Sequence, residues 1–133
     1  MGLAALDTNV LLRLIITEPA EQHERAHRVL TSPGARFLVV NHVFVELVFA
    51  LERHYKLNRE QVTHVVNRIL ELGNIECDTA VLSDALEFWR THAKLSFEDC
   101  LAAEMAQDAG AVPLWTFDRK LAHQHPAALE IPS

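Results

Sequence analysis

The chain has 133 residues, half of them hydrophobic, which predicts a single domain over residues 1–133 with an ordinary apolar core. Its net charge of −6 argues against general electrostatic attraction to nucleic acid. It does not exclude nucleic-acid chemistry, because bound cations and a local basic patch can reverse the field at one site.

The cysteine pattern and the N-terminal sequence indicate a cytoplasmic protein. Cys77 and Cys100 lie far apart without a metal-ligand spacing, which favours reduced thiols over a disulfide. No basic segment precedes a hydrophobic one at the N-terminus, so we expect no signal peptide. The most apolar stretch, residues 37–51, is too short to span a bilayer, so we expect no membrane segment.

Short apolar runs alternate with longer amphipathic segments along the chain. Branched and aromatic residues favour strands, whereas polar caps such as Asn41, Asn58 and Ser96 favour helix starts. The expected strands are residues 3–6 (buried on both faces), 36–40, 75–77, 112–115 and 128–131. The expected helices are residues 10–14, 19–30, 42–55, 59–70, 79–93, 97–107 and 119–122. This alternation predicts a three-layer α/β/α sandwich with a mainly parallel central sheet.

Four carboxylates occupy similar positions relative to these elements. Asp7 follows the first strand, and Asp118 follows the fourth. Glu46 lies about one and a half turns beyond the second strand, and Asp99 lies in the first turn of the sixth helix. The carboxyl ends of parallel strands and the first turns of the following helices face one edge of a sheet, so the four acids can converge there.

Convergent carboxylates need a cation. At about 4 Å a like-charged pair repels by several kcal/mol at an effective dielectric constant near 20, and a divalent ion removes that repulsion. A ligand set of oxygens alone selects the hard ions Mg²⁺ or Mn²⁺. Such an ion suits phosphodiester hydrolysis, because it activates water and neutralises developing charge while a carboxylate takes the proton.

Four segments resemble the acidic blocks of PIN-domain ribonucleases. They are DTNVLL at residues 7–12, the isolated Glu46, FEDCLAA at residues 97–103 and TFDRKL at residues 116–121. These blocks cover nearly the whole chain in the order of the family. The short length is similar to that of VapC toxins of bacterial toxin–antitoxin pairs.

The resemblance implies an Mg²⁺- or Mn²⁺-dependent endoribonuclease that cleaves RNA and is inhibited by a small VapB-like antitoxin. It implies that Asp7 and Asp99 are the core metal ligands and that Glu46 and Asp118 complete the catalytic, metal-binding cluster. The polar residues that it implies to orient the cluster are Asn9 and Thr116.

Three further expectations accompany this resemblance. Such proteins commonly form homodimers, which gives a second reason for the nearly all-apolar helix segment 43–51. Glu98 stands beside Asp99, and because adjacent helical residues point about 100° apart, only one of the two can face the cluster; the family pattern selects Asp99. The basic residues that can contact RNA phosphates are Arg13, Arg119 and Lys120.

Each acid also has an ordinary structural interpretation. Asp7, Asp99 and Asp118 precede or open helices and can serve in helix caps. Glu46 can instead form a buried ion pair with an arginine. The candidate arginines are Arg13 and Arg53.

Other functions stay open at this point. One is an RNA-processing PIN nuclease outside a toxin–antitoxin pair, and another is a non-catalytic PIN-like module that binds RNA or a partner. A phosphatase would use Asp7 as a covalent nucleophile, but the HAD phosphatases place a second acid two residues later, where this chain has Asn9. Residues 23–27 match the H-E-x-x-H motif of zinc hydrolases, although that helix is mostly polar and no clear third ligand follows.

Overall fold

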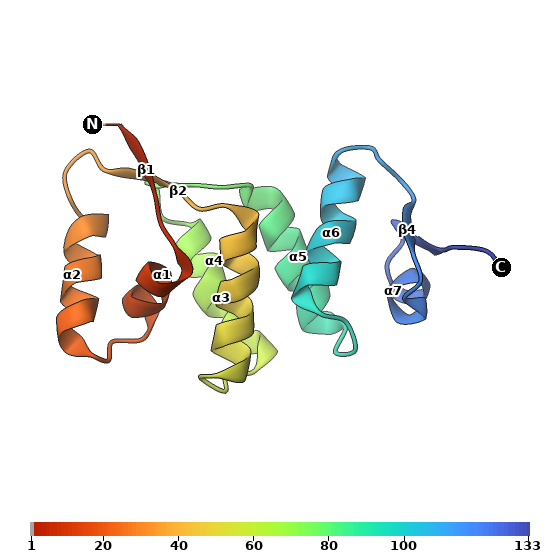
Figure 1. Ribbon diagram of the computed structural model, residues 1–133, viewed down its shortest axis with the longest axis horizontal. Helices are drawn as coiled ribbons and strands as arrows, with labels where there is room; N and C mark the ends of the chain where they lie inside the picture. Colours follow the sequence, from red (N-terminus) through yellow and green to blue (C-terminus); the bar gives the residue numbers. More distant parts are fainter. Residues whose placement is uncertain (1) are drawn as a thin grey trace. The chain divides into compact units, whose positions relative to one another are not determined.

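The structure is a computed structural model that describes residues 2–133 (Figure 1). The chain divides into two compact units, one ending at Asp78 and the other spanning residues 79–133. Each unit is described below by itself. The single domain expected over residues 1–133 therefore stays a prediction.

Unit 1 contains a parallel sheet whose strands are connected by pairs of helices. The strands are β1 (Leu3–Ala5), β2 (Arg36–Leu38) and β3 (Ile75–Glu76), hydrogen-bonded in the order β1-β2-β3. The helices are α1 (Thr8–Ile15), α2 (Ala20–Leu30), α3 (Asn41–Arg53) and α4 (Arg59–Leu70). Ala4 pairs with Phe37, and Phe37 in turn pairs with Ile75, all in parallel register. Because parallel neighbours need a crossover, each helix pair carries the chain back to the start of the next strand.

The core of unit 1 lies along α3. Its residues Phe44, Leu47 and Leu51 are fully buried, and α3 contacts both α1 and α4. Burial of each such side chain contributes about 1.5–3 kcal/mol relative to exposure. The expectation that the first strand is buried on both faces is wrong: Leu3, Ala4 and Ala5 are all exposed in β1, and Leu3 is half exposed.

Local capping signals explain where the helices of unit 1 begin. At α4 the Asn58 side chain accepts from Gln61 N–H at 2.8 Å, and the Gln61 side chain accepts from Asn58 N–H at 2.9 Å. This reciprocal pair confirms the predicted capping box. The prediction that Asn41 caps α3 is wrong by one residue, since Val40 occupies the cap and Asn41 is the first helical residue.

Unit 2 contains one parallel strand pair and three helices among its described residues. The strands are β4 (Leu114–Thr116) and β5 (Ala128–Glu130), with Trp115 opposite Leu129. The helices are α5 (Thr79–Thr91), α6 (Phe97–Asp108) and α7 (Arg119–Gln124). Helices α5 and α6 pack against each other, and α7 connects β4 to β5 while contacting both. Every strand pair described in the two units is parallel, which confirms the predicted α/β class with mainly parallel pairing.

The buried His125, which directly follows α7, forms a hydrogen bond with Glu104 on α6. The His125 side chain is 1% exposed; its Nε2 lies 2.9 Å from Glu104 Oε1, and its Nδ1 accepts from Ala127 N–H at 3.0 Å. Because Nδ1 is an acceptor here, the proton sits on Nε2 and is donated to Glu104. The ring also contacts Phe88, with centroids 4.4 Å apart. A neutral imidazole therefore satisfies both its nitrogens inside unit 2.

None of the helices among the described residues has the length and apolar character needed to cross a membrane.

We expect the Glu104–His125 hydrogen bond to stabilise unit 2. Replacement Glu104→Leu leaves the buried Nε2–H of His125 without an acceptor, which lowers the free energy of unfolding by about 1–3 kcal/mol. Replacement Glu104→Gln keeps a side-chain oxygen in place and lowers it less. Urea unfolding followed by circular dichroism measures both changes. Equal stabilities for the two variants would contradict this role of the hydrogen bond.

Candidate active site

Asp7 lies in unit 1 where β1 passes into α1. It is the N-cap of α1, and its Oδ1 accepts from Val10 N–H at 3.1 Å. The side chain is exposed. The structural interpretation of Asp7 as a cap is thus correct, but a carboxylate has about four acceptor positions and the cap uses one. Asp7 keeps the capacity to bind a cation.

Glu46 lies on α3, and its carboxylate is held by two neighbours. Thr8 Oγ1 donates to Glu46 Oε1 at 3.2 Å, and His42 Nε2 lies 3.3 Å from the same oxygen. The Glu46 side chain is 53% exposed, so it is not a buried acid. Because Thr8 follows Asp7 directly, this contact places the Glu46 side chain beside the first turn of α1, the helix that Asp7 caps.

The arginines considered as partners of Glu46 make other contacts. The Arg13 guanidinium donates to Glu18 O at 2.6 Å and to Tyr55 Oη at 2.7 Å. The Arg53 guanidinium lies 5.4 Å from the centre of the Phe49 ring. The interpretation of Glu46 as a buried arginine partner is therefore wrong. An RNA phosphate at Arg13 would compete with two hydrogen bonds that hold unit 1 together.

Asp99 lies in unit 2, in the first turn of α6. Its N–H donates to Ser96 Oγ at 3.1 Å, so Ser96 is the cap, as predicted. The side chain of Asp99 is half-buried, whereas that of Glu98 is exposed. The choice of Asp99 rather than Glu98 as the residue of the site stays a prediction. Since Ser96 supplies the capping oxygen, the Asp99 carboxylate is not needed to start the helix.

Asp118 lies between β4 and α7 and caps the helix. Its Oδ1 accepts from Lys120 N–H at 2.9 Å and from Leu121 N–H at 3.2 Å. Thr116 Oγ1 accepts from Asp118 N–H at 2.9 Å, so the hydroxyl fixes the backbone that carries the acid. The half-buried Asp118 is thereby set at the end of β4, the position expected for it.

The four acids divide equally between the two units. Asp7 and Glu46 belong to unit 1, and Asp99 and Asp118 belong to unit 2. Among the described residues, no group of three or more His, Cys, Asp or Glu side chains is arranged as a metal site. The convergence of the four carboxylates therefore stays a prediction. The donor set itself, exposed or half-buried carboxylate oxygens, fits Mg²⁺ or Mn²⁺.

The H-E-x-x-H segment forms part of helix α2, as expected. The rings of His23 and His27 have centroids 6.2 Å apart, and His23 Nδ1 lies 2.7 Å from Arg13 O. In the part of the chain that the structure describes, these histidines do not belong to any three-ligand group. The zinc-hydrolase interpretation thus gains no support from the fold.

Two contacts of the site were not anticipated from the sequence, those of Thr8 and His42 with Glu46. The i, i+4 spacing of His42 and Glu46 on a helix was a usable signal for the second. Nothing in the sequence pointed to the first, because the two residues are 38 positions apart. Asn9, expected to orient the cluster, is exposed in the first turn of α1.

Comparison with known proteins shows to which family the chain belongs. The PIN domain model matches residues 4–125, a span that includes all four acids. The chain belongs to the PIN domain family. This PIN domain is 33% identical over 119 residues to a VapC ribonuclease of Aquifex aeolicus, covering 86% of the chain and 87% of that protein. The match spans both units, and it confirms the resemblance that the acidic blocks indicated.

Because Asp7 and Asp118 cap helices, we expect their asparagine and alanine variants to differ in stability. Asparagine caps about as well as aspartate, so Asp7→Asn and Asp118→Asn keep the free energy of unfolding within about 0.5 kcal/mol of the parent protein. The corresponding alanine variants lose about 1 kcal/mol. Urea unfolding measures the difference. Asparagine variants as unstable as the alanine variants would show that charge, rather than the hydrogen bond, supports these helices.

Proposed function

We propose that this PIN domain is an endoribonuclease that hydrolyses RNA phosphodiester bonds with Mg²⁺ or Mn²⁺. The similarity to a VapC ribonuclease over most of both chains carries the proposal. The acidic blocks support it, because all four lie within the span that the family model matches. The exposed or half-buried setting of the acids suits a site that must admit both a cation and a polymer.

In this proposal Asp7 and Asp99 hold the cation, and Glu46 and Asp118 complete the cluster. When bound, the cation supplies charge neutralisation at the phosphate and acidifies water. Thr8 and His42 both contact Oε1 of Glu46 and so fix its orientation. The other oxygen, Oε2, is then the atom that takes the proton of the attacking water.

Thr116 and Asn9 have supporting roles in the same proposal. The Thr116 hydroxyl holds the backbone N–H of Asp118 and thereby fixes the direction in which that acid leaves β4. Asn9 presents an exposed amide within the first turn after Asp7, where it can orient water or phosphate. Arg119 and Lys120, which directly follow Asp118, are the proposed contacts to RNA phosphates; Arg13 is a weaker candidate because of its internal hydrogen bonds.

We also propose that the protein is the toxin of a toxin–antitoxin pair, acts in the cytoplasm and forms a homodimer. The near-complete coverage of a VapC protein of similar length supports the toxin role and a small VapB-like antitoxin as the partner. The homodimer is proposed on the nearly all-apolar segment 43–51 of α3, where Phe49 is 54% exposed and would be covered by the partner copy.

Cleavage of RNA by the purified protein tests the nuclease proposal. We expect cleavage with Mg²⁺ or Mn²⁺ and none with EDTA. Asp7→Asn and Asp99→Asn each reduce the rate by about 100-fold or more, because a metal ligand is lost while the fold is kept. The matched control is Asp108→Asn, at the opposite end of the helix that carries Asp99, and it cleaves at the parent rate. Cleavage that survives both EDTA and Asp7→Asn would end the proposal.

Growth of a bacterial host tests the toxin role separately. Induced expression of the parent chain should arrest growth and deplete intact RNA, whereas Asp7→Asn should do neither at the same protein level. Growth arrest that is equal for both chains would show that toxicity does not come from the acidic site. Normal growth with an active purified enzyme would instead favour an RNA-processing nuclease.

A further inference from the structure

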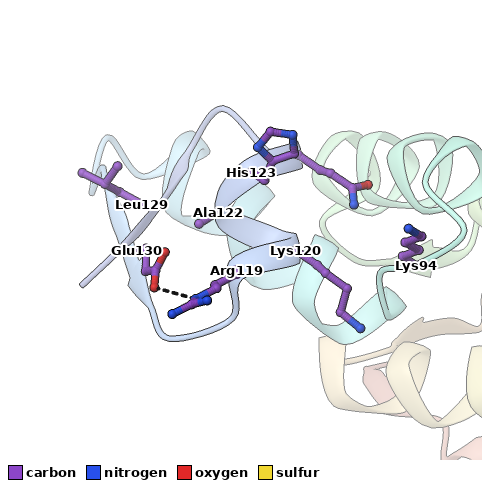
Figure 2. Close-up of a pocket in the computed structure, with 8 residues that line it drawn as sticks. Lys94, Arg119, Lys120, Ala122, His123, Leu129 and Glu130 are labelled. Atoms are coloured by element: carbon purple, nitrogen blue, oxygen red, sulfur yellow. Dashed lines mark hydrogen bonds and ion pairs between the residues drawn. The ribbon is translucent and has the colours of Figure 1, made fainter. Parts of the chain in front are cut away.

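Unit 2 carries a pocket of about 560 Å³ beside helix α7 (Figure 2). Its walls come from the first and later turns of α7, from β5 and from the loop between α5 and α6. All of its lining residues lie within residues 79–133, so the pocket is a property of unit 2 alone. The polar residues that line it are Lys94, Arg119, Lys120, His123, Gln124 and Glu130.

Positive charge is concentrated in this pocket. Residues 79–133 contain four lysines and arginines, and three of them line it. The fourth, Arg90, pairs with Glu87 at 2.6 Å on α5. Two of the three lysines in the chain, Lys94 and Lys120, are also among the lining residues. In a chain of net charge −6, such a grouping creates a local field opposite to that of the whole molecule.

The positive charges are only partly neutralised by the protein. Arg119 Nε lies 3.2 Å from Glu130 Oε2, and the Arg119 side chain is 86% exposed. The described residues contain no carboxylate within ion-pair distance of Lys94 or Lys120. Figure 2 shows both lysines on the same side of the pocket, while Arg119 turns toward Glu130. Since both ammonium groups line one pocket and neither has an acidic partner within ion-pair distance, an anion in that pocket would be attracted by both.

Helix α7 also connects the pocket to Asp118, one of the four candidate acids. Asp118 holds the N–H groups of Lys120 and Leu121, so the backbone that carries the basic side chains is tied to the end of β4. An anion bound by Lys120 is thus held by the same short segment as the Asp118 carboxylate.

We propose that this pocket binds a phosphate of the RNA substrate, next to the phosphate that is cleaved, with Lys94 and Lys120 as its main contacts. The proposal rests on the ribonuclease function above and adds a positioning site to it. The lysines act as point charges on the phosphate oxygens, and they recognise the backbone rather than the base. Arg119 joins them when phosphate displaces Glu130 from its guanidinium.

RNA binding without cleavage tests this proposal. Fluorescence anisotropy measures the Kd of a short labelled RNA for the Asp7→Asn protein, with Lys94→Gln or Lys120→Gln added, at several salt concentrations. We expect each substitution to raise Kd several-fold and to lower the slope of log Kd against log salt by about 1. The matched control is Lys56→Gln, a lysine of unit 1 outside the pocket, and it changes neither quantity.

Several outcomes would overturn the phosphate site. One is a Kd and a salt slope for the Lys94 and Lys120 variants equal to those of the Lys56 variant. Another is unchanged RNA binding together with weaker binding of a labelled oligoglutamate peptide, which would assign the pocket to an acidic protein segment. A third is a competition experiment in which inorganic phosphate displaces the RNA no better than chloride does at equal ionic strength. Because the binding assay reports Kd and the cleavage assay reports the rate, failure of the nuclease proposal and failure of this site are distinguishable.

Discussion

The unpaired N–H groups at the start of a helix are the constraint that places the candidate acids. The first turn of every helix leaves backbone donors that need an acceptor, and a carboxylate after a strand end supplies one. Asp7 does this at α1, and Asp118 does it at α7. At these two strand ends, the residue that meets the capping requirement also carries a negative charge. At α6 the requirement is met by Ser96, which leaves the Asp99 carboxylate available for other ligands.

Glu46 follows a different rule, since it lies inside a helix and its position depends on side-chain contacts. Thr8 reaches it from the first turn of α1, and His42 reaches it from one turn earlier on α3. The contact between Thr8 and Glu46 connects the end of β1 with the helix that follows β2. Packing of α1 against α3, driven by buried leucines, makes that contact possible. Core packing and site geometry in unit 1 thus have the same origin.

Features encoded by neighbouring residues could be predicted from the sequence, and features made by distant residues could not. The capping box of Asn58 and Gln61 and the Ser96 cap depend on three-residue spacings, and both are present. The parallel α/β class followed from alternating periodicities. The alternative of an arginine partner for Glu46 is wrong, and the sequence does not predict the contact with Thr8, because Thr8 is far away in sequence and a hydroxyl gives no charge signal. The exposure of β1 depends on which segments pack against the strand, which no local pattern records. Lys94 was overlooked for the same reason: 25 positions separate it from Arg119, and only the folded chain brings them to one pocket.

Helix α7 has six residues, too few to persist on its own in water. It is held at one end by the Asp118 cap and just beyond the other by the His125–Glu104 bond. These two attachments and the buried Leu121, rather than the exposed side chains of the helix, hold it in place. Arg119, Lys120 and His123 can therefore be exchanged during evolution at little expense to folding. Substitutions in this short exposed segment can therefore change the charge that lines the pocket while the scaffold stays unchanged.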